Sequence, residues 1–182
     1  VLHMDMPPVI TASTGMDALT HAIEAYVSKN AEPLSDALAL AAIRLIGQNI
    51  RTATYRPDCL EARSAMALAS LMAAAAFVNG GLGAVHGISQ AMGGIAHVSH
   101  VIGNALLLPF VCEANLPGNM ERYAQIAPLL GERTEELSLH QAARCCVDAI
   151  HRMIKELGLP AALHEVKVTR EMFPDIAKGG ME

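Results

Sequence analysis

Several residue types are scarce in this sequence, and each shortage narrows the choice of fold. Aromatic residues make up only 3% of the chain and tryptophan is absent, although 52% of the residues are hydrophobic. The core must therefore consist mainly of Ala, Leu, Ile, Val and the ten Met residues. A β-sandwich would need more aromatic and β-branched residues, whereas closely packed helices use small side chains. The composition predicts a globular, all-helical protein.

Charged residues are also sparse, at 17% of the chain, and the net charge is −5 without any run of Lys or Arg. This balance excludes nucleic acid and an anionic membrane surface as partners. Residues 64–112 contain no Lys, Arg, Asp or Glu, a length that raises the question of a membrane span. The stretch is interrupted by glycines at 80–81 and 93–94 and carries three histidines. We therefore expect central helices surrounded by other helices, and no membrane span.

The cysteines form no C-x-x-C pair, and two of the four are adjacent, an awkward arrangement for a disulfide framework. The first residues show no signal-peptide pattern. We therefore expect a reduced, cytoplasmic compartment. The cysteines are Cys59, Cys112, Cys145 and Cys146.

Hydrophobic spacing, with Pro and Gly as punctuation, predicts eight helices. A Pro7-Pro8 pair is expected to keep the first residues extended. Only residues 166–168 have a strand-like pattern, and the chain shows neither a repeat nor a linker. We therefore expect residues 1–182 to form a single helical domain. The predicted helices span about 14–28, 35–53, 57–79, 82–93, 99–109, 117–131 and 135–157, with a short one after Thr169.

Two groups of polar residues suggest a metal site. Asp17 and His21 are four residues apart, so they lie on one helix face and can bind the same divalent metal. On its own this spacing is a weak signal, because a hydrogen bond within the helix explains most such pairs. His86, His97 and His100 lie in the charge-free stretch, where buried histidines need partners.

The Gly93-Gly94 break between these histidines allows successive helices to aim two of them at one point. One carboxylate with two or three imidazoles suits Fe(II) or Zn(II) and leaves a position open for a substrate oxygen. On spacing alone, scattered core histidines without a metal remain an equal alternative. Glu24 lies one turn beyond His21, and we expect it to be a solvated helix charge rather than a partner of the site.

Four segments resemble, in order and spacing, the iron-containing (group III) alcohol dehydrogenase family. The resemblance covers most of residues 8–131 and implies the C-terminal, metal-binding helical domain of such an enzyme, a bundle-like fold similar to the α domain of dehydroquinate synthases. It also implies that the metal ligands are one Asp and three His, here Asp17, His21, His86 and His100. The segments are TGMDALTHAIEAYVS, SDALALAAIRLI, FVNGGLGAVHG and GNALLLPFV.

The sequence departs from the family pattern at two positions near these ligands. Gln90 stands where the family has a histidine that faces the nicotinamide, so a proton relay at this catalytic position is in question because Gln does not titrate. Val101 follows the last ligand in place of the usual Gly. By the same resemblance, Phe77 and Asn79 belong to a stretch that borders the cofactor.

The resemblance implies NAD(P)-linked hydride transfer between an alcohol and an aldehyde, with Fe²⁺, or alternatively Zn²⁺, as a Lewis acid on the substrate oxygen. The family's N-terminal nucleotide-binding domain and its extreme C-terminus find no match in this sequence. We therefore expect this chain alone to show no dehydrogenase turnover, because it needs that domain as a partner. We also expect the protein to form a homo-oligomer. The alternatives are a zinc-dependent relative of glycerol dehydrogenase or dehydroquinate synthase, and a non-catalytic helical interaction domain.

Overall fold

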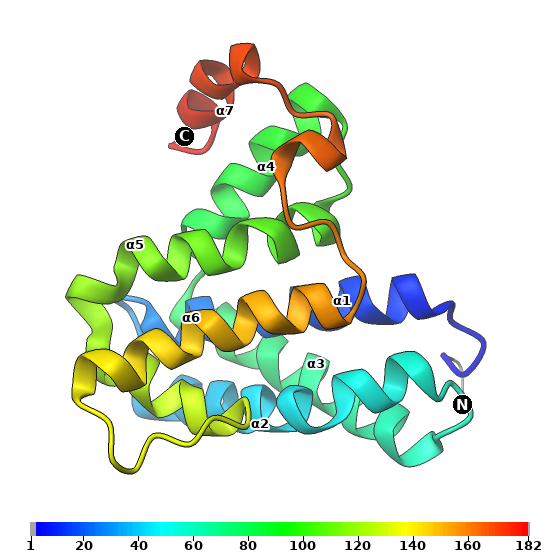
Figure 1. Cartoon of the computed structure of the whole chain (residues 1–182), viewed down its shortest axis with the longest axis vertical. Helices are drawn as coiled ribbons and strands as arrows, with labels where there is room; N and C mark the ends of the chain where they lie inside the picture. Colours follow the sequence, from blue (N-terminus) through cyan, green and yellow to red (C-terminus); the bar gives the residue numbers. More distant parts are fainter. Residues whose placement is uncertain (1–2, 182) are drawn as a thin grey trace.

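The computed structural model describes residues 3–181, and within that range all regular elements are helices (Figure 1). The prediction of an all-helical fold is confirmed. The α-helices are α1 (Pro8–Val27), α2 (Pro33–Tyr55), α3 (Leu60–Gly80), α4 (Ala84–Ala96), α5 (His100–Leu129), α6 (Leu139–Glu156) and α7 (Phe173–Gly179). Two short 3₁₀ helices, η1 (Leu163–Val166) and η2 (Arg170–Met172), precede α7.

Prolines account for the main errors in the predicted boundaries. Helix α1 begins at Pro8, earlier than predicted, because a proline is tolerated in the first turn, where its missing N–H has no partner to lose. Helix α5 continues through Pro109 and Pro117 and joins two predicted helices, with non-helical backbone only at Asn119. Residues 166–168, whose sequence pattern resembled a strand, form the end of η1 and the start of the connection that follows it.

Helix α1 lies at the centre of the main bundle and packs against α2, α3 and α5 (Figure 1). Small side chains permit this close packing, and Ala12, Ala22 and Ala25 are fully buried. Gly80 at the end of α3 approaches so closely that a Cβ there would lie 3.0 Å from the Ala25 carbonyl oxygen. The Ala-rich composition therefore produces a bundle in which α1 is enclosed on most of its surface.

The hydrophobic side chains form two separate clusters. The main core joins α1, α2, α3, α5 and α6. A smaller core consists of Met92, Val98, Val168 and Ile176, and joins the second half of α4 to the C-terminal segment and α7. Figure 1 shows α4 and α7 at one end of the molecule, beyond the main bundle. Val85 attaches the start of α4 to the main core, so α4 bridges the two clusters.

Helices α3 and α5 are long and apolar enough to cross a membrane, by length and composition alone. Core helices of a packed bundle pass the same test. Here α5 packs against α1 and α6, and α3 packs against α1 and α2. Only 33% of the apolar window of α3 is buried, so the expectation that other helices surround it was wrong for this helix. Helix α3 also keeps Leu68, Leu71 and Val78 exposed.

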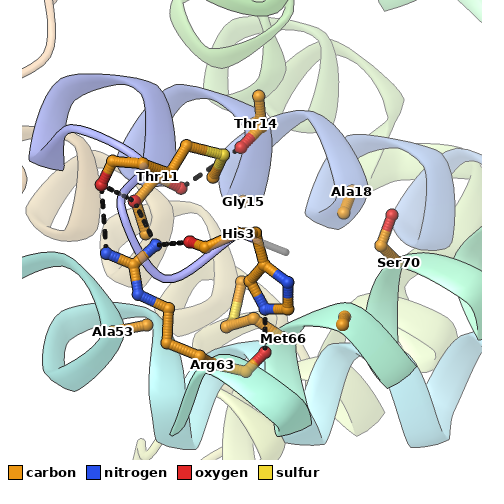
Figure 2. Close-up of a pocket in the computed structure, with 11 residues that line it drawn as sticks. His3, Thr11, Thr14, Gly15, Ala18, Ala53, Arg63, Met66 and Ser70 are labelled. Atoms are coloured by element: carbon orange, nitrogen blue, oxygen red, sulfur yellow. Dashed lines mark hydrogen bonds between the residues drawn. The ribbon is translucent and has the colours of Figure 1, made fainter. Parts of the chain in front are cut away.

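A buried arginine fastens the first residues to α3 (Figure 2). The Arg63 guanidinium is almost fully buried and donates hydrogen bonds to the carbonyl oxygens of His3, Met6 and Pro57 and to the Thr11 hydroxyl. It borders a cavity of about 170 Å³ between α1 and α3. These partners are neutral, so the buried charge is balanced by carbonyl dipoles rather than by a carboxylate.

Candidate metal centre

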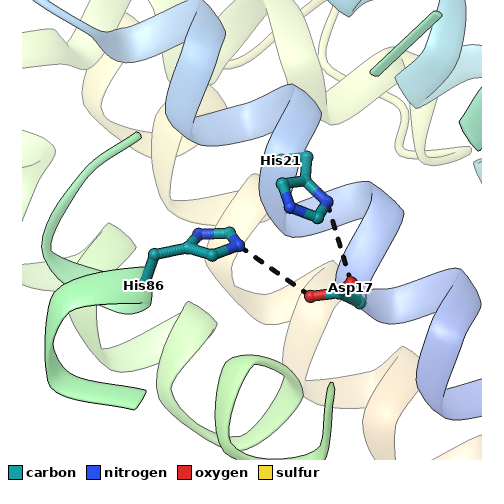
Figure 3. Close-up of side chains that lie close together, drawn as sticks. All are labelled: Asp17, His21 and His86. Carbon is teal, nitrogen blue, oxygen red and sulfur yellow. Dashed lines mark ion pairs between the residues drawn. The ribbon is translucent and has the colours of Figure 1, made fainter. Parts of the chain in front are cut away.

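Helix α1 supplies the first two donors of the candidate metal centre. Asp17 Oδ2 and His21 Nδ1 are 3.8 Å apart on one face of the helix, as the spacing predicted (Figure 3). The His21 ring stacks on Phe77 of α3, with ring centroids 4.6 Å apart. Burial lowers the pKa of His21 below its ordinary value, and the Asp17 carboxylate opposes this shift only in part. The site therefore favours a neutral imidazole, which is the form that binds a metal.

The glycine-rich turn between α3 and α4 brings His86 to these two residues. Gly81 ends α3 with φ of 86°, a left-handed conformation that favours glycine. A Cβ at Gly83 would lie 2.8 Å from a Glu24 carboxylate oxygen, so only glycine permits this approach. The turn is a helix–helix connection, as the sequence predicted, and it starts α4 directly against α1.

Glu24 of α1 caps the start of α4 and orients His86. Its carboxylate is 5% exposed and accepts hydrogen bonds from the backbone N–H groups of Gly83, at 2.9 Å, and Val85, at 2.7 Å. It also lies 2.6 Å from His86 Nδ1. Because a carboxylate only accepts, Nδ1 must carry the proton, and the Nε2 lone pair faces Asp17. The expectation of a solvated charge at Glu24 was wrong, because α4 begins over this side chain.

His100 and Asn104, one turn apart on α5, complete the cluster. His100 Nε2 lies 3.8 Å from Asp17 Oδ1, and the His100 side chain is 44% exposed, which leaves this edge open. Asn104 is fully buried, and its Nδ2 is 2.5 Å from Asp17 Oδ1 and close to both His86 Nε2 and His100 Nε2. Ser89 ties α4 to α5 by donating to the His100 carbonyl oxygen at 3.1 Å.

The donor set fits a transition-metal ion in both chemistry and spacing. Donor atoms of Asp17, His21 and His86 all lie within 4.8 Å of one another. Asp17 Oδ1 is 3.9 Å from His86 Nε2, a little more than the roughly 3.4 Å between two ligands in a tetrahedral zinc site. One carboxylate and three imidazoles are ligands for Fe(II) or Zn(II), and the exposed side of His100 leaves access for a small molecule.

Of the other residues named from the sequence, Phe77 contacts a member of this cluster, and the remaining three are exposed. Phe77 forms a wall of the site through its stacking on His21. Gln90 follows His86 by one turn of α4 and is exposed. The exposed Asn79 donates to the Ala75 carbonyl oxygen of its own helix, at 2.8 Å. The exposed His97 follows the end of α4 and has a φ of 54°. The helix break that the sequence placed at Gly93-Gly94 therefore lies at His97.

Sequence reasoning missed Asn104 as a member of the site. The available signal was its position one turn after His100 in a stretch without charged residues. Asn104 and His100 share a helix face for the same reason that Asp17 and His21 do. Residue spacing alone did not indicate that this face of α5 meets α1; only the family resemblance placed His100 beside Asp17.

A family model described as "Fe-containing alcohol dehydrogenase family, C-terminal" matches residues 11–182. The chain is 45% identical over 178 residues to the 1,3-propanediol dehydrogenase of Citrobacter freundii, a match that covers 98% of this chain and 46% of that protein. It is 44% identical to the NAD-dependent methanol dehydrogenase of Bacillus methanolicus, covering 100% of this chain and 48% of that protein. The chain therefore belongs to the iron-containing alcohol dehydrogenase family.

Solved structures agree with this assignment. A crystal structure of a 1,3-propanediol oxidoreductase superposes on the chain with a TM-score of 0.96 at 44% identity, covering 98% of this chain and 47% of that one. An alcohol dehydrogenase from Oenococcus oeni gives the same TM-score at 36% identity. The chain spans about half the length of the relatives that it matches.

Proposed function

We propose that this chain is the metal-binding part of an NAD(P)-linked alcohol dehydrogenase or aldehyde reductase. Asp17, His21, His86 and His100 would hold Fe²⁺, with Zn²⁺ as the second candidate. The observation that carries this proposal is that donor atoms of Asp17, His21 and His86 lie within 4.8 Å of one another, with His100 Nε2 3.8 Å from the same carboxylate. Family membership supports a dehydrogenase rather than a purely structural site.

The bound metal would supply Lewis-acid activation of the alcohol or carbonyl oxygen. The residues of the chain hold the donors ready for it. Glu24 keeps the His86 Nε2 lone pair free, and burial keeps His21 neutral. Phe77 shields one face of His21 from water. Gln90, one turn beyond His86, can hydrogen-bond a substrate hydroxyl but cannot accept its proton as a base, so proton transfer would need a water molecule at this position.

The nicotinamide would come from a nucleotide-binding part outside these 182 residues, with Phe77 and Asn79 on the side of the site that faces it. The relative named as an NAD-dependent methanol dehydrogenase is about twice as long as this chain. We further propose a cytoplasmic homo-oligomer acting on small alcohols or aldehydes. A Gly-rich βαβ segment encoded immediately upstream of residue 1 would support this proposal, and an unrelated upstream sequence would contradict it.

Metal stoichiometry tests the site directly. The 182-residue chain, loaded with Fe²⁺ without oxygen and then desalted, should retain about one ion per chain by elemental analysis. The double variant His86→Ala/His100→Ala should retain almost none, because two of the four donors are lost. His140→Ala is the matched control, since His140 is exposed on α6, and it should keep the full content.

The outcomes separate the alternatives. An unchanged metal content in the double variant would favour a non-catalytic helical domain with structural histidines. Competition between equal amounts of Fe²⁺ and Zn²⁺ distinguishes the iron enzyme from a zinc-dependent relative. The chain alone should show no NAD(P)-dependent turnover with 1,3-propanediol, and measurable turnover would contradict the assignment of the nicotinamide site to another part.

A further inference from the structure

The amide of Asn104 occupies the point at which the candidate metal ligands meet. Its Nδ2 lies 2.5 Å from Asp17 Oδ1, 3.1 Å from His86 Nε2 and 3.0 Å from His100 Nε2. These atoms belong to three of the four residues that would hold the metal. An amide nitrogen has two hydrogens, so it shares them among three acceptors. The amide therefore acts on the same lone pairs that a cation requires.

The orientation of this amide is determined by its neighbours. The reverse orientation would place the amide oxygen 2.5 Å from a carboxylate oxygen, where the two would repel each other. The Glu24 contact keeps the proton of His86 on Nδ1, so Nε2 can only accept. The partial positive charge of the NH₂ group thus faces the ligands, as the charge of a metal ion would.

The opposite side of the Asn104 amide has no such partner. Its Oδ1 is buried, and among the described residues it accepts no hydrogen bond. An unpaired buried acceptor is unusual in a folded protein and calls for a functional explanation. Only the three inward contacts hold the amide, so nothing on its other side would retain it once those acceptors are taken.

We propose that Asn104 is a further residue of this site, one that competes with the metal ion for the Nε2 atoms of His86 and His100 and thereby sets the affinity of the site. The inference rests on the proposed metal site. An imidazole Nε2 has a single lone pair, so coordination of a cation by His86 and His100 would break their two contacts with the amide, whereas a carboxylate oxygen has two lone pairs and Asp17 can keep its own. Asn104 holds the donors in position before the metal arrives, and it weakens the metal complex by the hydrogen bonds that are lost.

Titration with Co²⁺ alone tests this proposal, because its visible absorption bands report coordination directly. For Asn104→Ala in the 182-residue chain we expect Co²⁺ to bind about tenfold more tightly than to the unaltered chain, the equivalent of one hydrogen bond to a charged group. Asn49→Ala is the control, since Asn49 donates only to the Leu45 carbonyl oxygen of its own helix. It should leave the affinity unchanged.

Thermal unfolding of the same proteins, with and without saturating Co²⁺, is the second readout. Competition predicts that Asn104→Ala lowers Tm without metal and much less with metal, so the metal-induced shift grows. An equal loss of Tm under both conditions, or weaker or unchanged Co²⁺ binding, would show a structural role and overturn the inference. If the unaltered chain itself binds no Co²⁺, the proposed metal site fails and the inference fails with it.

Discussion

Replacement of Glu24 by Gln should weaken both the fold and the metal site. The Glu24 carboxylate accepts three hydrogen bonds, from Gly83 N–H, Val85 N–H and His86 Nδ1. One oxygen accepts from Val85, and the other accepts from both Gly83 and His86. Glutamine keeps a single acceptor oxygen, so it can preserve at most two of these bonds and must turn an NH₂ group toward the third donor.

The expected loss follows from these contacts. A hydrogen bond to a charged group contributes about 1.5–3 kcal/mol, and a negative charge at a helix N-terminus contributes about 0.3–1 kcal/mol more. The sum is a loss of roughly 2–4 kcal/mol in the free energy of unfolding. For a chain of this size, Tm should fall by about 4–16 °C. Metal affinity should fall about 10- to 100-fold, because His86 loses the carboxylate that orients it.

Thermal and urea unfolding, followed by far-UV circular dichroism, measures the first effect, and Co²⁺ titration measures the second. Glu156→Gln is the control, because Glu156 pairs with Arg51 at the surface at 2.6 Å, with both side chains more than one-third exposed. Its loss should cost less than about 1 kcal/mol. If Glu24→Gln and Glu156→Gln have the same small effect, the capping role argued for Glu24 is refuted.

Three further predictions concern the bundle itself. Arg63→Met should lower the free energy of unfolding by about 2–4 kcal/mol in urea, because three hydrogen bonds to residues 3–11 and one to Pro57 are lost, and a change below about 0.5 kcal/mol would contradict that role. Gly47→Ala should lower Tm measurably, because its Cβ would lie 2.5 Å from the Leu129 carbonyl oxygen, and an unchanged Tm would show that α2 and α5 can separate freely. Burial raises the pKa of the Cys112 thiol to about 12 and that of the Cys146 thiol well above its ordinary value. A thiol reagent at pH 8 should therefore label only Cys59 and Cys145 before the chain unfolds. Rapid labelling of all four cysteines in the folded chain would refute the packing.

The sequence predicted the helical fold well because its signals are local. Ala-rich segments without aromatic residues favour helices wherever they lie, and Gly81 ended α3 where the pattern placed a turn. The prolines misled the prediction, since the effect of a proline depends on whether its position in the helix needs an N–H group. Pro8 stands in the first turn of α1, and α5 continues through the buried Pro109 while packing against α1 and α6.

From residue spacing alone, the candidate site was predictable only within each helix, and only the family resemblance assigned all four ligands to one metal. The spacing of Asp17 and His21 placed them on one face of α1, and the structure agrees. The meeting of that face with His86 depends on the close approach of Gly83 to Glu24, two residues almost sixty positions apart. No periodic pattern encodes such a contact, so Glu24 was misassigned and Asn104 was overlooked.

The division of the hydrophobic side chains into two clusters has a consequence for motion. Local opening of a protein follows the boundaries of its cooperative units, and the smaller cluster buries much less apolar surface than the main core. The amides in the second half of α4 should therefore exchange with deuterium by sub-global opening, whereas those of α1 should exchange only by global unfolding. Because His86 lies in the first turn of α4, which Val85 and Glu24 hold against the main core, such an opening would leave His86 and Asp17 together while the far end of α4 detaches. A metal held by Asp17 and His86 should therefore leave exchange in the second half of α4 unchanged.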